Sequence, residues 1–176
     1  MRRPTARALA ALLGTLAVGA ALPSIALATL SLTTSAAPTF TDNLNLGDQT
    51  QTYTAALTAK DTSSGTSAGW NLTITSTEFT TGGTTPRTLA TNASSVTSVA
   101  SACAGGTCVN PVNSITYPLT VPAGSTPPTA VKFFNAAANT GQGTFSVTPT
   151  VRVTVPQNSY AGTYTSTLTL AIVSGP

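Results

Sequence analysis

The chain has no histidine, and charged side chains are scarce: 4 acidic and 7 basic residues make up 6% of 176. An ordinary soluble domain carries about a quarter of charged residues. Without histidine, the usual general base of nucleophilic catalysis is missing, and so is a common ligand of zinc. The composition therefore argues against most enzyme classes, and we expect no catalytic residue, no metal and no cofactor.

The few remaining ionisable residues do not suggest catalysis either. Neither lysine follows a serine at the helical spacing that a serine–lysine dyad needs. The segment from Asp42 to Asp48 has Leu44 at its third position, which excludes an EF-hand loop. A glycosidase needs two carboxylates across a sugar, whereas we expect solvated side chains near loop or strand ends for the four acidic residues, Asp42, Asp48, Asp61 and Glu78.

Long hydrophobic runs are confined to the N-terminus. Three arginines within residues 1–7 precede an apolar run from Ala8 to Leu22, and Ala26-Leu27-Ala28 follows. This order is typical of a secretory signal peptide, so we predict cleavage after Ala28, with residues 1–28 removed and residues 29–176 forming one domain. The alternatives are an uncleaved anchor and an earlier cut after Ala20. After cleavage we expect no membrane attachment.

Removal of residues 1–28 also removes the basic excess of the chain. Four basic residues then balance four acidic ones, and no two basic residues are adjacent. A basic patch is the usual sign of binding to nucleic acid or to anionic membranes. We therefore expect neither of these partners.

There are only two cysteines, Cys103 and Cys108, and both lie in the exported part with two glycines between them. Export implies an oxidising compartment, and the glycines permit a tight turn, so we predict a disulfide. Closing so short a loop stabilises by only about 2 kcal/mol, which makes the bridge a local clamp. A redox pair is the weaker alternative, because such pairs usually have two intervening residues beside a helix start.

What the chain has in abundance is hydroxylic residues, 37 threonines and 17 serines, together with apolar residues at every second position. Threonine favours strands and remains soluble, and alternation is the mark of a strand with one buried face. We predict an all-β fold, a single antiparallel β-sandwich of about seven to eight strands. The expected strands lie at 30–32, 53–57, 70–74, 115–121, 145–155 and 164–172, with weaker candidates at 95–100 and 131–133.

Two details of these strands give further expectations. Pro118 and Pro149 lack a backbone donor, so their strands should lie at sheet edges or bend there. Threonines at every second position in 73–77 and 163–169 should form outward ranks. The ordinary interpretation is a soluble outer face, and the alternative is a flat surface for a glycan or ice.

The segments Gly69-Trp70-Asn71-Leu72-Thr73-Ile74 and 153–172, with its Val-Pro and Ala-Gly-Thr-Tyr sequences, resemble the WxL domain of Gram-positive bacteria. That family is named for two Trp-x-Leu motifs. Trp70-Asn71-Leu72 matches the first motif, whereas the second position reads Leu170-Ala171-Ile172 and lacks the tryptophan. The resemblance implies an exported β-rich module that attaches to the cell wall by binding peptidoglycan without a covalent anchor.

The resemblance makes Trp70, Leu72, Leu170 and Ile172 the candidate binding residues. Alternation, however, puts Trp70 on the face of Leu72 and Ile74, which favours core packing over an exposed sugar platform. Our first hypothesis is a non-catalytic surface module bound to peptidoglycan. The second, based on zero net charge and long strands with exposed edges, is a structural subunit of a surface layer, fimbria or coat that contacts other surface proteins.

Overall fold

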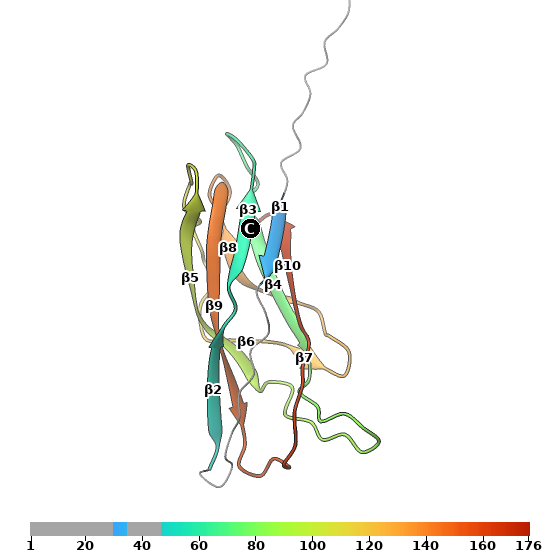
Figure 1. The fold of residues 1–176 in the computed structure, drawn as a ribbon. Coiled ribbons are helices and arrows are strands. Elements are labelled where there is room, and N and C mark those ends of the chain that lie inside the picture. The colour runs from blue at the N-terminus through green and yellow to red at the C-terminus, as the bar shows by residue number, and fades with distance from the viewer. Residues whose placement is uncertain (1–29, 35–46) are drawn as a thin grey trace, which may run out of the picture.

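The computed structural model describes residues 30–34 and 47–176, so the expected signal peptide and Asp42 lie outside the described residues. The described residues form ten strands and no helix (Figure 1). The strands are β1 Leu30–Thr34, β2 Gln49–Thr54, β3 Leu57–Asp61, β4 Trp70–Thr77, β5 Ser94–Gly105, β6 Leu119–Thr120, β7 Ala123–Gly124, β8 Val131–Ala136, β9 Gly143–Val155 and β10 Leu168–Ser174.

The strands form two sheets that face each other, which confirms the predicted all-β sandwich. The six-stranded sheet has the order β1-β3-β9-β5-β6, with β2 beside β9, and the four-stranded sheet has the order β10-β4-β7, with β8 beside β4. All strand pairs are antiparallel except the two-residue pair of β4 with β7. Apolar side chains of both sheets meet in a main core, whose largest fully buried members are Trp70, Phe133, Phe145, Leu57, Leu72 and Ile74, and a smaller cluster consists of Leu89, Val153 and Val155.

The longest strand, β9, is the centre of the larger sheet, so of the two expectations for Pro149, a sheet edge or a bend, the sheet edge is wrong. β5 pairs with one side of β9, while β3 and β2 pair in succession with the other side. The Pro149 carbonyl accepts a hydrogen bond from Ala55 N, at the break between β2 and β3. Because the N–H and C=O of an antiparallel residue point to the same neighbour, the missing donor falls where the partner strands are interrupted.

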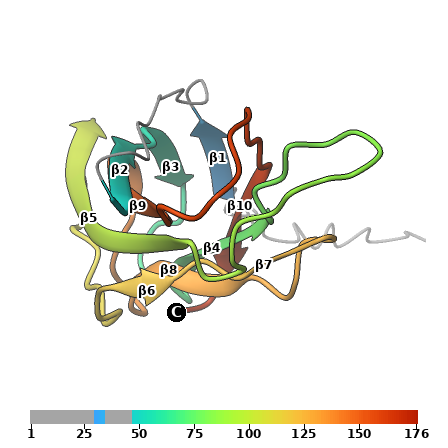
Figure 2. The same cartoon turned by 90° about the horizontal axis from the view of Figure 1, so that it is seen from below.

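On two sides of the sandwich, strands of one sheet approach strands of the other. β5 curves from one layer toward the other (Figure 2), and its pairing with β9 has two register shifts, which are the usual cause of such bending. The following segment 119–124 pairs first with β5 through β6 and then with β4 through β7. On the other side β1 and β10, each the last strand of its sheet, lie side by side.

Three of the predicted strands are divided or shortened in the structure, and one of them, the predicted strand 164–172, begins only at Leu168. The segment 53–57 is divided between β2 and β3, since the chain changes its position along β9 at Ala55 and Ala56. Of the segment 115–121, only Leu119–Thr120 is a strand, and it is the edge strand that the neighbouring Pro118 leads us to expect. The preceding residues bond to side chains instead: Asn113 Oδ1 accepts from Ile115 N and Asn135 N.

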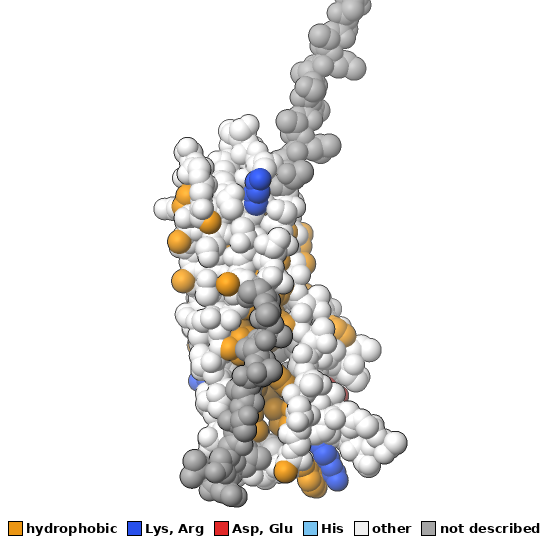
Figure 3. Space-filling view, viewed as in Figure 1, with side chains coloured by type: hydrophobic (Ala, Val, Ile, Leu, Met, Phe, Trp, Pro, Cys, Tyr) orange, Lys and Arg blue, Asp and Glu red, His pale blue; other side chains and the backbone are white. Residues whose placement is uncertain are grey.

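The surface is mostly uncharged, and Figure 3 shows one face with very few basic or acidic side chains. The outward threonines expected on β4 do not form an open surface. Thr75 is only 5% exposed, and its hydroxyl donates to the Pro128 carbonyl at 2.9 Å, so the segment 122–128 covers the middle of this rank, while Thr73 and Thr77 are half-buried. The threonines at 163, 165, 167 and 169 are exposed as expected.

Candidate functional site

The two segments that carry the motif positions lie side by side in the smaller sheet. β4 and β10 pair antiparallel, with Leu72 opposite Ile172, Ile74 opposite Leu170, and Trp70 opposite Ser174. The pairing continues past the strand ends, because Gly175 N donates to Gly69 O and Asn71 Nδ2 donates to Gly175 O. The last residues of the chain are thereby fixed to the start of the first motif.

Trp70 is completely buried, which confirms its predicted place in the core. Its indole Nε1 donates to the Gly141 carbonyl at 2.9 Å, and its ring centroid lies 5.8 Å from that of Phe134. The backbone around the ring leaves no room for a side chain: a Cβ at Gly141 would lie 2.6 Å from the indole nitrogen. A buried indole normally has a hydrogen-bond partner, and here the Gly141 carbonyl provides it.

The other three motif side chains also point inward. Leu72 is fully buried, while Leu170 and Ile172 are half-buried and pack against the core. None of the four offers an open aromatic or aliphatic platform in this arrangement. Their contribution to ligand binding stays a prediction, and the structure gives all four a packing role.

A shallow, open cavity with a mostly apolar lining lies beside the motif, where the ends of the two sheets meet. It has a volume of about 250 Å³, and it lies between β1 and β3 of one sheet and the ends of β4 and β10 of the other. The lining residues are Leu30, Asp61, Ser63, Thr66, Ser67, Ala68, Gly69 and Ser174. Gly69 directly precedes Trp70, so the cavity and the first motif share this part of the backbone.

Asp61 is the charged residue of this cavity, and it is only 4% exposed, so the expectation of a solvated side chain is wrong. It is the last residue of β3, on the same face as the buried Leu57 and Ala59. Its Oδ1 accepts a hydrogen bond from Ser63 N at 2.8 Å. The hydroxyl oxygens of Ser63 and Ser67 are buried and have no hydrogen-bond partner among the described residues.

Another cavity, of about 260 Å³, is lined by Ala90, Asn92, Ala93, Thr154 and Pro156, none of which is charged. A separate surface feature is Tyr160, which is 58% exposed and lies under the guanidinium of Arg87, 3.8 Å from the ring centroid. The phenol of Tyr164 donates to the Tyr160 carbonyl at 3.1 Å. This exposed aromatic was not singled out by the sequence, because residues 158–163 show no clear alternation.

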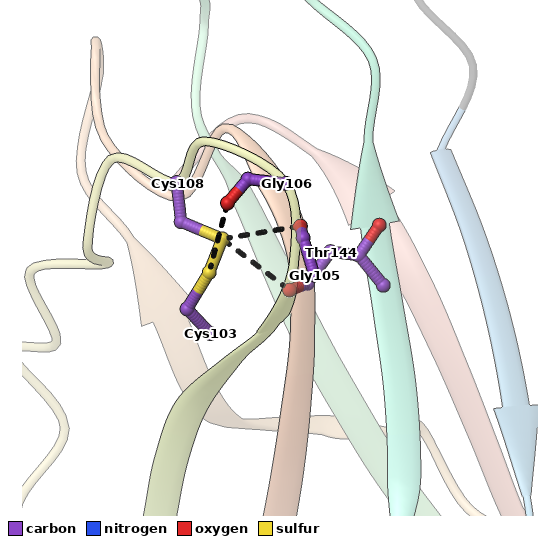
Figure 4. The surroundings of a disulfide bond; sticks show 5 residues. All are labelled: Cys103, Gly105, Gly106, Cys108 and Thr144. Atoms are coloured by element: carbon purple, nitrogen blue, oxygen red, sulfur yellow. Dashed lines mark hydrogen bonds between the residues drawn. A yellow bond between two sulfur atoms is a disulfide. The ribbon is translucent and has the colours of Figure 1, made fainter.

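The predicted disulfide between Cys103 and Cys108 is present and closes the turn after β5 (Figure 4). The Cys108 sulfur also lies 3.5 Å from the Thr144 carbonyl oxygen on the neighbouring β9. The bridge thus holds the end of β5 and the next residues against the start of the central strand.

The part of the chain that the structure describes contains no cluster of three or more histidine, cysteine, aspartate or glutamate residues suited to a metal ion. Within the same residues, no helix has the length and apolar character needed to span a membrane.

Comparison with protein-family models gives one match, described as "WxL domain surface cell wall-binding", over residues 15–176. No curated protein and no solved structure gives a significant match. The match covers the cavity, the disulfide and both motif positions within a single family unit.

Proposed function

The chain belongs to the WxL family of surface cell wall-binding domains, and from this premise we propose that it binds peptidoglycan directly and non-covalently, without catalysing a reaction. The protein is an extracellular module associated with the cell wall. The proposal includes export by the signal peptide at 1–28 and a mature domain at 29–176.

The observation that carries the choice of peptidoglycan is the distribution of charge. Anionic wall polymers would call for a basic patch. The four basic residues of the described chain lie on four separate segments, namely Lys60 in β3, Arg87 in a loop, Lys132 in β8 and Arg152 in β9. A balanced, hydroxyl-rich surface instead suits a ligand of sugars and short peptides.

The test is sedimentation of the purified exported chain with peptidoglycan sacculi stripped of other wall polymers, at low and high salt. We expect the protein to pellet at both salt concentrations, because binding through uncharged groups is screened little by ions. The control is the same preparation after muramidase digestion, which should leave the protein in the supernatant. Protein that stays in the supernatant with intact sacculi at both salt concentrations would refute the proposal.

The hypothesis of a structural subunit in a surface layer, fimbria or coat stays a prediction. Assembly by strand addition needs a free sheet edge. Among the described strands, β6 and β7 have two residues each and β1 and β10 lie against each other, while β2 and the part of β5 beyond β6 each pair with β9 alone. We carry forward the wall-binding proposal, because the family match supports it.

A further inference from the structure

We propose that the exposed pair of Arg87 and Tyr160 is a binding site for a carboxylate group, and that its ligand in the wall is the free carboxyl end of an uncross-linked stem peptide. The choice of the wall peptide rests on the proposed function. The carboxylate site itself rests on the contact between these two side chains and on the loops that hold them.

The first step of the argument concerns the guanidinium of Arg87. It is exposed and lies over the ring of Tyr160, 3.8 Å from the ring centroid. Among the described residues Arg87 forms no ion pair, and its hydrogen bonds come from its backbone, which bonds twice to Thr81. The guanidinium N–H groups are therefore available to a ligand, and their planar fork matches the two oxygens of a carboxylate.

The second step concerns the tyrosine. Tyr160 is 58% exposed although Arg87 lies on its ring. The hydrogen bond that it receives from Tyr164 goes to its backbone carbonyl, so its side chain adds no hydrogen bond to this loop. An open ring beside the guanidinium can contact the apolar part of the residue that carries the carboxylate. Tyrosine and arginine are also enriched among the residues that contribute most to binding.

The third step is the rigidity of the site. The two side chains come from loops far apart in sequence, 78–90 and 156–165, which lie side by side at one end of the sandwich (Figure 1). Thr80 N donates to Thr165 O at 3.0 Å, and Thr165 N donates to Thr80 O at 2.9 Å. Tyr164 packs against the smaller hydrophobic cluster beneath. Because the site is formed before a ligand arrives, binding costs little ordering of the protein.

The fourth step distinguishes between the anions of a cell wall. Polymeric phosphates present many charges and call for several basic residues together. Arg87 is the only basic residue of the two loops. One cation beside an apolar ring suits one carboxylate on a small apolar residue, which the end of a peptide provides. Since this contact adds a single ion pair, high salt should weaken sedimentation with sacculi without abolishing it.

The test begins with small probes, so that it does not depend on wall binding. N-acetyl-D-alanyl-D-alanine carries one carboxylate, its C-terminal amide is the neutral counterpart, and glycerol 3-phosphate represents the phosphate polymers. In NMR titrations of the exported chain at low salt, we expect the dipeptide to shift the side-chain Nε–H signal of Arg87 and the backbone amide signal of Tyr160. The amide should leave both unchanged. Absence of shifts with the dipeptide, or tighter binding of glycerol 3-phosphate, would overturn the proposal.

The matched variants are Arg87→Gln and Arg152→Gln. Glutamine at 87 keeps both backbone bonds to Thr81, so the fold should survive, while affinity for the dipeptide should fall about fivefold with the loss of charge. Arg152 is exposed on β9, outside the two loops, so Arg152→Gln should bind as the wild type does. Unchanged affinity in Arg87→Gln, or an equal loss in Arg152→Gln, would contradict the assignment.

Tyr160→Ala separates a ligand site from a contact that only holds the loops together. The ring is exposed, so its removal should leave the midpoint of urea unfolding unchanged and weaken dipeptide binding about threefold. If the contact is only structural, Tyr160→Ala and Arg87→Gln both lower the midpoint and the dipeptide shifts no signals in the wild type. That result would overturn the proposal.

Sacculi whose carboxylates have been converted to amides connect the site with the wall. We expect the wild type to bind untreated sacculi more tightly than amidated ones, and Arg87→Gln to bind both equally. Dipeptide binding with no sedimentation on any sacculi would refute the proposed function and leave the carboxylate site standing. Sedimentation of Arg87→Gln equal to the wild type on untreated sacculi would refute the stem peptide as ligand and leave the proposed function standing.

Discussion

Replacement of Trp70 distinguishes a packing role for the first motif from a ligand-binding role. Removal of a large buried aromatic side chain usually destabilises a protein by about 3–5 kcal/mol. In Trp70→Ala the Gly141 carbonyl also loses its donor, which adds about 1–3 kcal/mol for an unpaired buried group. Since small proteins are stable by only about 5–15 kcal/mol, this variant should be close to unfolding.

Trp70→Phe is the informative variant, because it keeps a ring beside Phe134 and loses mainly the indole N–H. We expect a loss of about 1–3 kcal/mol, measured by calorimetry or by circular dichroism in urea. Each 1 kcal/mol corresponds to about 2–4 °C in midpoint for a protein near this size. Sedimentation of the folded variant with sacculi should remain within about twofold of the wild type, because the ring lies inside the core.

The wild type provides its own check, since it has a single tryptophan. Its emission should be blue-shifted and poorly quenched by iodide. A stability change below about 0.5 kcal/mol in Trp70→Phe, together with a large loss of wall binding, would refute the packing argument and make the ring a ligand contact.

Three further predictions concern stability in urea. Gly141→Ala should lose at least about 2 kcal/mol more than Gly65→Ala, since both have positive φ but only the first has close neighbours; equal losses would contradict the clash with the indole. The double variant Cys103→Ser, Cys108→Ser should lose about 2 kcal/mol, and an unchanged midpoint would show that the bridge is dispensable. Burial raises the pKa of Tyr53 above 10.0, so its contribution to stability is present below pH 10 and falls as the pH rises above it; Tyr53→Phe should reduce this alkaline loss, and an identical pH profile would refute it.

Period-two patterns predicted which side chains are buried, but they gave no prediction of which strands pair. Tyr117 and Leu119 turn toward the core as alternation requires, yet the backbone before residue 119 bonds to side chains such as that of Asn113. Likewise, no sequence feature near Ala55 indicates that the strand is interrupted there and that pairing with β9 begins again at Leu57. Pairing depends on residues far apart in sequence, and a single-strand pattern does not contain that information.

At the cavity, the expectation for Asp61 was wrong although the alternation along the strand indicates a buried position. Leu57, Ala59 and Asp61 alternate on one face, so the pattern already placed the carboxylate inside. The expectation of a solvated Asp61 rests instead on its place near the end of a strand, where acidic side chains usually reach the solvent. Ser63 and Ser67, whose hydroxyls are buried, lie in a loop, where the sequence has no alternation that predicts burial. The resemblance led to the motif residues, and the neighbouring cavity became visible only with the structure.

The central position of β9 has a consequence for the order of folding. Its partners β2, β3 and β5 all precede it, and none of them can complete its pairing before residues 143–155 are available. The larger sheet therefore depends on contacts between distant parts of the chain, and such topologies fold slowly. As long as residues 143–155 are still inside the cell, the larger sheet lacks its middle strand, so an exported chain can complete this sheet only outside.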